Sequence, residues 1–225
     1  MIVGEPVPEE PVLLAFAQSE IFSRRWSGGL ARHLTEAVAE RVRYSPREEW
    51  SEADREAVLG AVRASRPPLL DPLLRLRAGW FDASMEAAAL PDLYVPTAPE
   101  YRGLAPDGRL TTLVQEVEKG RDTPDAEFSG GYRRMEREFA ASRWQGRPCL
   151  VASGPEGPYT VFEGLTRLGV LLARRQGGKP VPDPMPVYLG ITERLADWGF
   201  ACEAAIGPPP AAPGLPTAPR ATDPL

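Results

Sequence analysis

The chain has 225 residues, and its 31 acidic residues outnumber its 26 lysines and arginines, which gives a formal net charge of −5. This length suits one large domain or two small ones. Lysine and arginine contacts to phosphates supply most of the energy of sequence-independent nucleic-acid binding, so such proteins usually carry a basic excess. The acidic balance therefore argues against nucleic acid as a partner.

The apolar segments and the N-terminus bear on localisation. No apolar run approaches the length that a bilayer-spanning helix needs. The first residues, MIVGEPVPEEPV, carry acids and prolines where a signal peptide carries lysine or arginine. We therefore expect a cytoplasmic protein that does not contact membrane.

Cysteine and histidine are too scarce for several kinds of chemistry. Cys149 and Cys202 do not make a disulfide framework, and the apolar surroundings of Cys149 predict a buried side chain. His33 is the single histidine, which excludes zinc sites built on several histidines and leaves it without a cysteine or acid at ligand spacing. We expect His33 to be a partly exposed residue on a helix.

The first 95 residues predict a helical region. After an irregular lead of about ten residues, apolar spacings of three and four predict helices over residues 11–22 and 30–43. A third helix opens at Ser51, whose run SEADREAVLGAVRAS has the Ser-x-x-Asp capping form. Trp80, Phe81 and Met85 are expected to be core contacts between these helices and the later part of the chain.

The proline-punctuated segment around residue 95 is the best candidate boundary, and Leu93 and Val95 suggest a short edge strand there. A second domain is expected over residues 96–206. The tail, residues 207–225, is rich in proline and should be disordered; it is either a plain flexible tail or a motif for a protein partner.

The second region alternates helices with short strands. Residues 110–119 predict a helix, residues 149–152 and 159–163 predict two strands of an antiparallel hairpin, and residues 186–191 alternate most clearly. Thr192 is expected to cap a last helix. The predicted fold class is therefore α+β, with a helical N-terminal portion followed by a small mixed sheet.

The most informative stretch is YTVFEGLTRLGVLLA, residues 159–173, which predicts a strand, a glycine turn and a helix. Alternation places Val161 and Glu163 on one face of the strand and Phe162 on the other. Gly164 ends the strand, and the amides of the following helical turn favour anions. Arg167 is unfavourable near this positive end of the helix dipole, which is a reason to suspect a bound phosphate.

A phosphate group would contact the backbone amides from Gly164 onward, the Thr166 hydroxyl and the Arg167 guanidinium. Glu163 would then act as a catalytic base or hold a magnesium ion. Two other interpretations stay open: Glu163 is a structural acid that pairs with Arg167 when no ligand is bound, or the turn is an ordinary strand–helix connection with a solvated arginine.

Three segments carry a resemblance to a known family: GGYRRMEREFAASRWQGRPCLVAS, FEGLTRLGVLLA and PVYLGITERLADW. In order and spacing they resemble the ParB/sulfiredoxin-like family over residues 128–199. Gly164 and Arg167 match its Gly-x-x-Arg turn, and Glu163 with Leu168 fit the variant form EGxxRL. The resemblance implies a phosphate pocket that takes a nucleotide with Mg or a phosphorylated small molecule.

The chain departs from two branches of that family. Sulfiredoxins carry a cysteine directly after the turn glycine, where Leu165 stands here, so the nucleophile of their reductase chemistry is missing. Partition proteins carry an acid and a second arginine where Leu165 and Thr166 stand, and a helix-turn-helix segment that is also missing here. These departures count against both reactions.

Three functional classes remain. The first is a nucleotide-dependent phosphotransferase or phosphohydrolase, and the second is a catalytically inactive module for nucleotide sensing or protein interaction. The third, a DNA-processing or partition-like protein, has the charge balance against it. Arg133 and Arg134 either reach the pocket edge or are solvated. The loop acids Asp122, Asp125 and Glu127 either bind metal with the nucleotide or are solvated.

Overall fold

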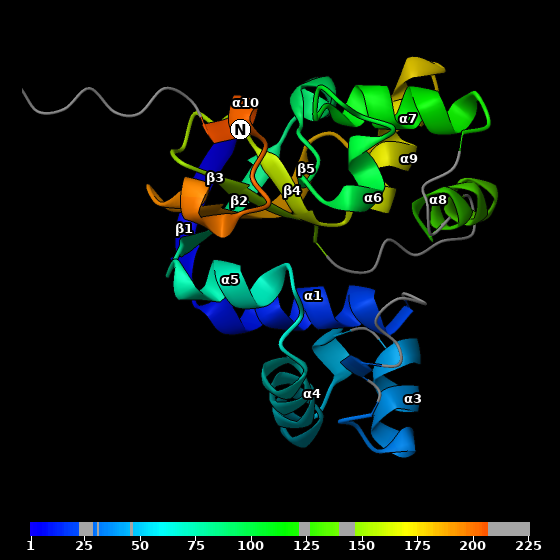
Figure 1. Ribbon diagram of the computed structural model, residues 1–225. Coiled ribbons are helices and arrows are strands. Elements are labelled where there is room, and N and C mark those ends of the chain that lie inside the picture. The colour runs from blue at the N-terminus through cyan, green and yellow to red at the C-terminus, as the bar shows by residue number, and fades with distance from the viewer. Residues whose placement is uncertain (23–28, 31, 46, 122–126, 140–146, 207–225) are drawn as a thin grey trace, which may run out of the picture.

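The computed structural model describes residues 1–225 apart from residues 23–28, 31, 46, 122–126, 140–146 and 207–225 (Figure 1). The predictions for the proline-rich tail and for Asp122 and Asp125 fall outside the described residues.

A mixed five-stranded sheet forms the centre of the molecule (Figure 1). Strands β3 and β5 pair in parallel, and the other neighbouring pairs are antiparallel. With its helical N-terminal part, this sheet confirms the predicted α+β class. In spatial order the strands are β1 (Ile2–Val7), β2 (Gly79–Met85), β5 (Met185–Ile191), β3 (Cys149–Ala152) and β4 (Thr160–Glu163).

The early helices cover one face of the sheet. In Figure 1, α1 and α5 lie against this face, and α3 and α4 pack on the side of α1 that faces away from it. The capping form at Ser51 is confirmed, because its hydroxyl accepts the Asp54 amide at the start of α4. The elements are α1 (Glu9–Phe22), α3 (Glu36–Tyr44), η1 (Arg47–Glu49), α4 (Glu52–Ser65) and α5 (Leu70–Arg75).

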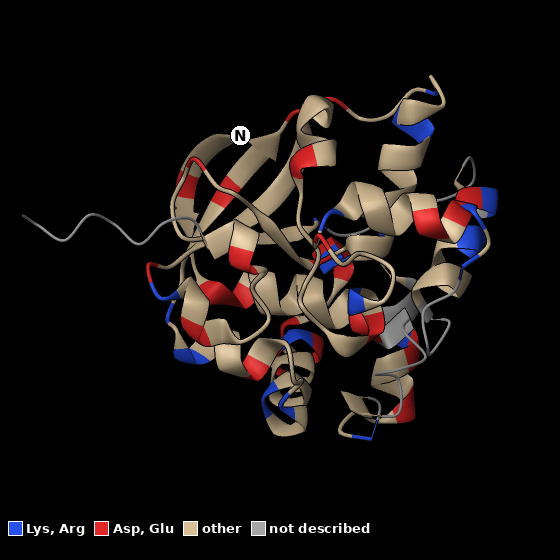
Figure 2. Ribbon diagram, turned by 45° about the horizontal axis from the view of Figure 1, so that its top comes forward, with Lys and Arg blue, Asp and Glu red and all other residues tan. Residues whose placement is uncertain are grey.

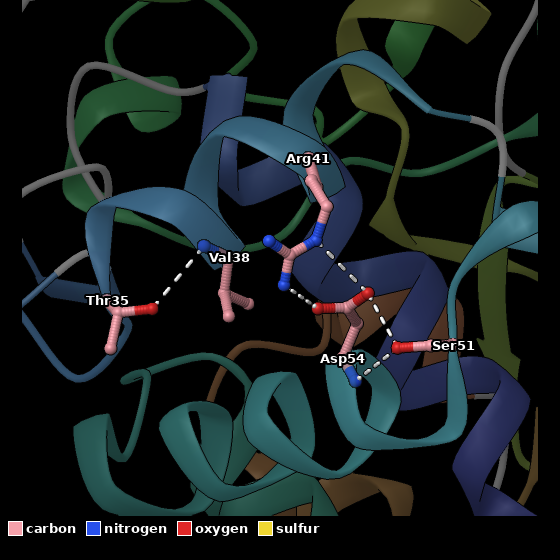
Figure 3. Close-up of polar contacts among 5 residues, drawn as sticks. All are labelled: Thr35, Val38, Arg41, Ser51 and Asp54. Carbon is pink, nitrogen blue, oxygen red and sulfur yellow. Dashed lines mark hydrogen bonds and ion pairs between the residues drawn. The ribbon is translucent and has the colours of Figure 1, made fainter.

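An ion pair fixes α3 against α4 (Figure 3). Asp54 accepts from Arg41 over 2.6 Å and from the Ser51 hydroxyl over 2.7 Å, so a single carboxylate joins the cap of α4 to the neighbouring helix. Thr35 caps α3 through a longer contact of 3.4 Å to the Val38 amide. The helix expected over residues 30–43 is wrong in its first part, because α3 begins only at Glu36. His33 lies in an exposed turn rather than on a helix.

The later helices cover the opposite face, where α9 packs against α7 and α8. The helices predicted at residue 110 and after Gly164 are both confirmed. These elements are η2 (Ala87–Asp92), α6 (Pro99–Arg102), α7 (Leu110–Glu118), α8 (Glu127–Glu138) and α9 (Leu165–Gln176). The short elements η3 (Leu195–Trp198) and α10 (Glu203–Ile206) follow β5, and Leu195 and Trp198 of η3 pack in the core with α1.

The chain end after β5 differs from the prediction. Thr192 does not open an α-helix; its hydroxyl accepts the Arg194 amide over 3.3 Å, and the short 3-10 helix η3 follows. A turn of this kind suffices to bury Trp198, whose indole N–H donates to the Leu69 carbonyl over 2.8 Å. This bond ties the C-terminal part of the chain to the early helices.

Two strands were missed from the sequence. The expected irregular lead is β1, an edge strand with a mostly exposed surface and a register shift between Val3 and Pro6. Trp80 and Met85 are buried as expected, but they lie on β2, which pairs with β5 along its whole length. The sheet therefore contains strands from before residue 95 (β1 and β2) and from after it (β3, β4 and β5).

The strand expected near residue 95 is reduced to isolated bridges that Tyr94 makes with Arg109 and with Thr160. The Tyr94 amide donates to the Tyr159 carbonyl over 2.9 Å, and the Val161 amide donates back to Tyr94 over 2.8 Å. Leu93, Tyr94 and Val95 are all buried. This segment covers the β4 edge of the sheet.

In the view of Figure 2, acidic and basic residues are interspersed along the helices. None of the helices in the described ranges is both long and apolar enough to cross a bilayer.

Candidate functional site

The site begins with a bulge in β4. Cys149 pairs with Glu163 and Leu150 pairs with Val161, so Phe162 is an extra residue opposite β3. A β-bulge of this kind changes the direction of the side chains that follow it. Phe162 stacks on Phe16 of α1 with ring centroids 5.4 Å apart, and Glu163 also lies on the α1 side.

This arrangement corrects the alternation expected from the sequence. Val161 packs in the core on the α9 side, whereas Glu163 does not share its face. Alternation along a regular strand predicts that Val161 and Glu163 share one face. The extra residue Phe162 brings Glu163 to the other face of the sheet, next to the buried thiol of Cys149.

Gly164 makes the turn from β4 into α9. It adopts a left-handed conformation with φ of 88°, which is accessible to glycine with little strain. A Cβ atom at this position would lie 3.0 Å from the Cβ of Pro148 and 3.2 Å from an Arg167 nitrogen. Glycine is therefore required here both by the backbone angle and by the close approach of Pro148 and Arg167.

Glu163 and Arg167 form a buried ion pair, from Nη2 of Arg167 to Oε2 of Glu163. The Glu163 side chain is 3% exposed and the Arg167 side chain 10%. Of the interpretations left open by the sequence, pairing of Glu163 with Arg167 is the arrangement that the structure shows. The solvated arginine of an ordinary turn is not.

Helix α1 covers the carboxylate of this pair. The Ser19 hydroxyl and the Gly164 amide both donate to Glu163, and Arg47 of η1 contributes a second positive charge nearby. Arg47 is itself held by a 3.0 Å bond from its Nη1 to the carbonyl oxygen of Pro11, the third residue of α1. The carboxylate therefore lies where β4, α1, α9 and η1 meet.

Burial is the largest influence on the ionisation of Glu163. It raises the pKa of the carboxyl above its ordinary value, although Arg167, the hydrogen bonds from Ser19 and the Gly164 amide, and Arg47 all act in the opposite direction. Burial likewise raises the pKa of the Cys149 thiol, and the Glu163 charge adds to this effect. Cys149 is therefore a packed neighbour of the carboxylate, held in its thiol form.

The remaining predicted contact, Thr166, is partly exposed at the first turn of α9. It lies beside α8, where a Cβ atom added to Gly131 would be 3.4 Å from the Thr166 methyl group. Gly131 thus allows α8 to approach the start of α9 closely. Leu165 is also partly exposed, so this turn reaches the surface through Leu165 and Thr166 while Arg167 points into the protein.

The other predicted contributors within the described ranges, Arg133, Arg134 and Glu127, belong to α8. Arg133 and Arg134 are exposed on α8, and the Glu127 side chain is outside the described part of the structure. Within the described residues, no group of three histidine, cysteine, aspartate or glutamate side chains is placed to hold a metal ion.

Sequence reasoning missed Ser19, Arg47 and Cys149 as neighbours of Glu163. Ser19 and Arg47 come from α1 and η1, far from residue 163 in the chain. Cys149 lies on β3, and the hairpin predicted for residues 149–152 and 159–163 could have placed it near Glu163. For Ser19 the signal is a polar run from residue 18 that interrupts an apolar helix. That interruption marks a face of α1 with a polar partner.

The chain was compared with protein-family models, curated proteins and solved structures, and nothing in any of the three matches it. The resemblance to the ParB/sulfiredoxin-like family stays a prediction, carried by the residues around Gly164.

Proposed function

We propose that the protein binds the phosphate group of a nucleotide or another phosphorylated small molecule at the N-terminus of α9. The phosphate accepts hydrogen bonds from the amides of the first turn, the Thr166 hydroxyl and the Arg167 guanidinium. Gly164 has no side chain to accept from these amides, and α9 is 12 residues long, so its dipole favours an anion at this end.

The observation that carries this proposal is the position of Arg167. A cation in the first turn opposes the helix dipole, and burying it carries a further cost. The buried acid Glu163, four residues earlier, forms an ion pair with Arg167 and offsets part of this cost. A phosphate at the same helix end offers Arg167 a second, two-pronged partner in a favourable electrostatic position.

A second candidate is a binding module without catalysis. Glu163 is buried and already accepts from Arg167, Ser19 and the Gly164 amide. A catalytic base must reach the proton that it removes. This engagement of the carboxylate favours a sensing role, whereas catalysis as a phosphotransferase or phosphohydrolase, with or without Mg, requires Glu163 to be released when the ligand binds.

Ligand binding is tested first with a thermal-shift panel of nucleotides, pyrophosphate, phosphate and sulfate, and then by calorimetry. Thr166→Val keeps the shape of the side chain and removes its hydroxyl, and Arg167→Lys keeps the charge and removes the two-pronged geometry. We expect each to weaken binding, with Arg167→Lys losing roughly 1.5–3 kcal/mol, the scale of a charged hydrogen bond.

The matched control is Arg175→Ala, at the exposed C-terminal end of the same helix. It should bind the ligand as tightly as the parent protein. If Arg167→Lys and Thr166→Val, both folded, bind every panel hit like the parent, the phosphate does not lie at α9.

A phosphate-release assay on the parent and on Glu163→Gln separates the two candidate functions. Loss of turnover in Glu163→Gln with retained binding identifies the enzyme.

A further inference from the structure

Arg167 has two competing anionic partners in the proposed function. One is the Glu163 carboxylate, to which it is bonded without ligand, and the other is the phosphate at the start of α9. The same guanidinium cannot keep its full contact with a buried acid and also turn toward an anion at the surface. Binding therefore takes positive charge away from Glu163.

Little else is placed to replace that charge. Among the described residues, the titratable and charged neighbours of Glu163 are Arg167 from α9, Arg47 from η1 and Cys149 from β3. Arg47 already acts on Glu163, and its bond to the Pro11 carbonyl holds it in place, so it does not move in to replace Arg167; Cys149 brings no positive charge. Ser19 and the Gly164 amide are neutral donors. A carboxylate buried in such surroundings and deprived of its ion-pair partner is stabilised by taking up a proton.

We infer that the phosphate site is proton-coupled: anion binding at α9 draws Arg167 away from Glu163, and Glu163 takes up a proton in the same step. The inference rests on the proposed function. It names the regulation of that site: the same ligand binds more tightly as the pH falls. The proton comes from solvent and adds to a carboxylate oxygen of Glu163, so the step involves no redox change.

The sign follows from linkage. In the ligand-free protein Arg167 lowers the pKa of Glu163, opposing the effect of burial. In the bound state that lowering is reduced and a new negative charge is nearby, so the pKa of Glu163 is higher than before. Protons are taken up on binding between the free-state and bound-state pKa values, and the dissociation constant rises with pH across this window.

Sulfate is the probe for this experiment, because it stays doubly ionised near neutral pH, whereas phosphate groups titrate with a pKa of about 6. Its dissociation constant is measured by calorimetry from about pH 5 to about pH 8.5, in buffers of different ionisation enthalpy to count protons. For the parent protein we expect the constant to rise by up to about tenfold per pH unit within the window.

Glu163→Gln removes the titrating group and releases Arg167. It should bind sulfate with a nearly pH-independent constant, without proton uptake, and more tightly than the parent at the alkaline end. If Glu163→Gln does not fold, Ser19→Ala serves instead, since the loss of one donor to the carboxylate moves the window to higher pH. Ser65→Ala, whose hydroxyl donates to Val62 within α4, is the matched serine control.

The outcomes separate this inference from the function on which it rests. If neither sulfate nor any member of the ligand panel binds the parent or Glu163→Gln, the phosphate site itself is wrong. If sulfate binds, but without proton uptake or with the same pH slope in the parent and Glu163→Gln, the site stands and the coupling is overturned. If Ser19→Ala is the test protein, the coupling is overturned when the pH dependence of its sulfate dissociation constant is the same as that of the parent.

Discussion

The two faces of the sheet are packed with different kinds of side chain. The core on the α9 side is almost entirely aliphatic, with Phe128 and Tyr132 as its buried aromatic residues among those described. The core on the α1 side holds six buried aromatic residues in the described part of the chain: Phe16, Trp50, Trp80, Phe162, Tyr188 and Trp198.

Buried polar groups occur on both sides of the sheet, with Ser129 and Glu100 among the later helices. The Glu163–Arg167 pair meets α1 through Ser19, and Gln18 of α1 is 3% exposed with neither its amide nitrogen nor its carbonyl oxygen hydrogen-bonded. A close-packed aliphatic face loses stability when its helices shift. On the α1 side, an ion pair and an unsatisfied amide can form new hydrogen bonds when their partners change.

The largest expected effect comes from Phe162, which contacts three aromatic partners: Phe16, Trp80 and Trp198. Phe162→Ala should lower the free energy of unfolding by about 3–5 kcal/mol, because a cavity opens at the centre of the α1-side core. Urea denaturation measures the loss. Phe162→Leu should recover much of it, and a loss under about 1 kcal/mol for the alanine variant would show that this aromatic cluster does not hold α1 to the sheet.

A smaller effect is expected from Gly190 on β5. Trp80 of β2 lies directly over it, so that an added Cβ atom would be 2.8 Å from the indole ring. Gly190→Val should displace Trp80, cost about 1–3 kcal/mol through overpacking, and red-shift the tryptophan fluorescence.

The control for this substitution is Gly60→Ala in α4, where an added Cβ atom meets nothing within 4 Å. There the change should raise stability by up to about 1 kcal/mol, because alanine favours a helix interior over glycine. An unchanged emission spectrum in Gly190→Val would contradict the close stacking of Trp80 on β5.

The smallest effect has the opposite sign. Gln18→Met keeps the length of the side chain and removes two buried polar atoms without hydrogen bonds. We expect the free energy of unfolding to rise by roughly 1 kcal/mol, since an unsatisfied buried polar group is destabilising by about 1–3 kcal/mol. Thermal and urea denaturation both report it. A drop in stability would show that the Gln18 amide is hydrogen-bonded in solution, contrary to this prediction.

Helical periodicity allowed most of the fold to be predicted. The capped run from Ser51 and the leucines after Gly164 repeat their apolar positions every three or four residues, and each forms the expected helix. Residues 11–22 are also helical as expected, but their apolar residues are consecutive and Val12 to Ala17 are all buried. β5 followed from strict alternation. These signals are local, so they are fully present in the sequence.

The missed elements depend on distant partners. β1 carries glycine and proline and has little buried surface, and it is a strand only because β2 lies beside it. The extra residue in β4 is defined by its register with β3, which alternation within β4 does not contain. The pairing of Glu163 with Arg167 could be proposed from their spacing, but the burial of both by α1 required the fold.

The strand order has a consequence for synthesis of the chain. β5 is the last strand to leave the ribosome, yet it lies between β2 and β3 and pairs with both. Until residue 191 has emerged, the sheet exists at most as two separate halves, β1 with β2 and β3 with β4, each with an open edge. The final strand therefore joins the halves at once, and a nascent chain that stops before β5 exposes two edges that can pair with other chains.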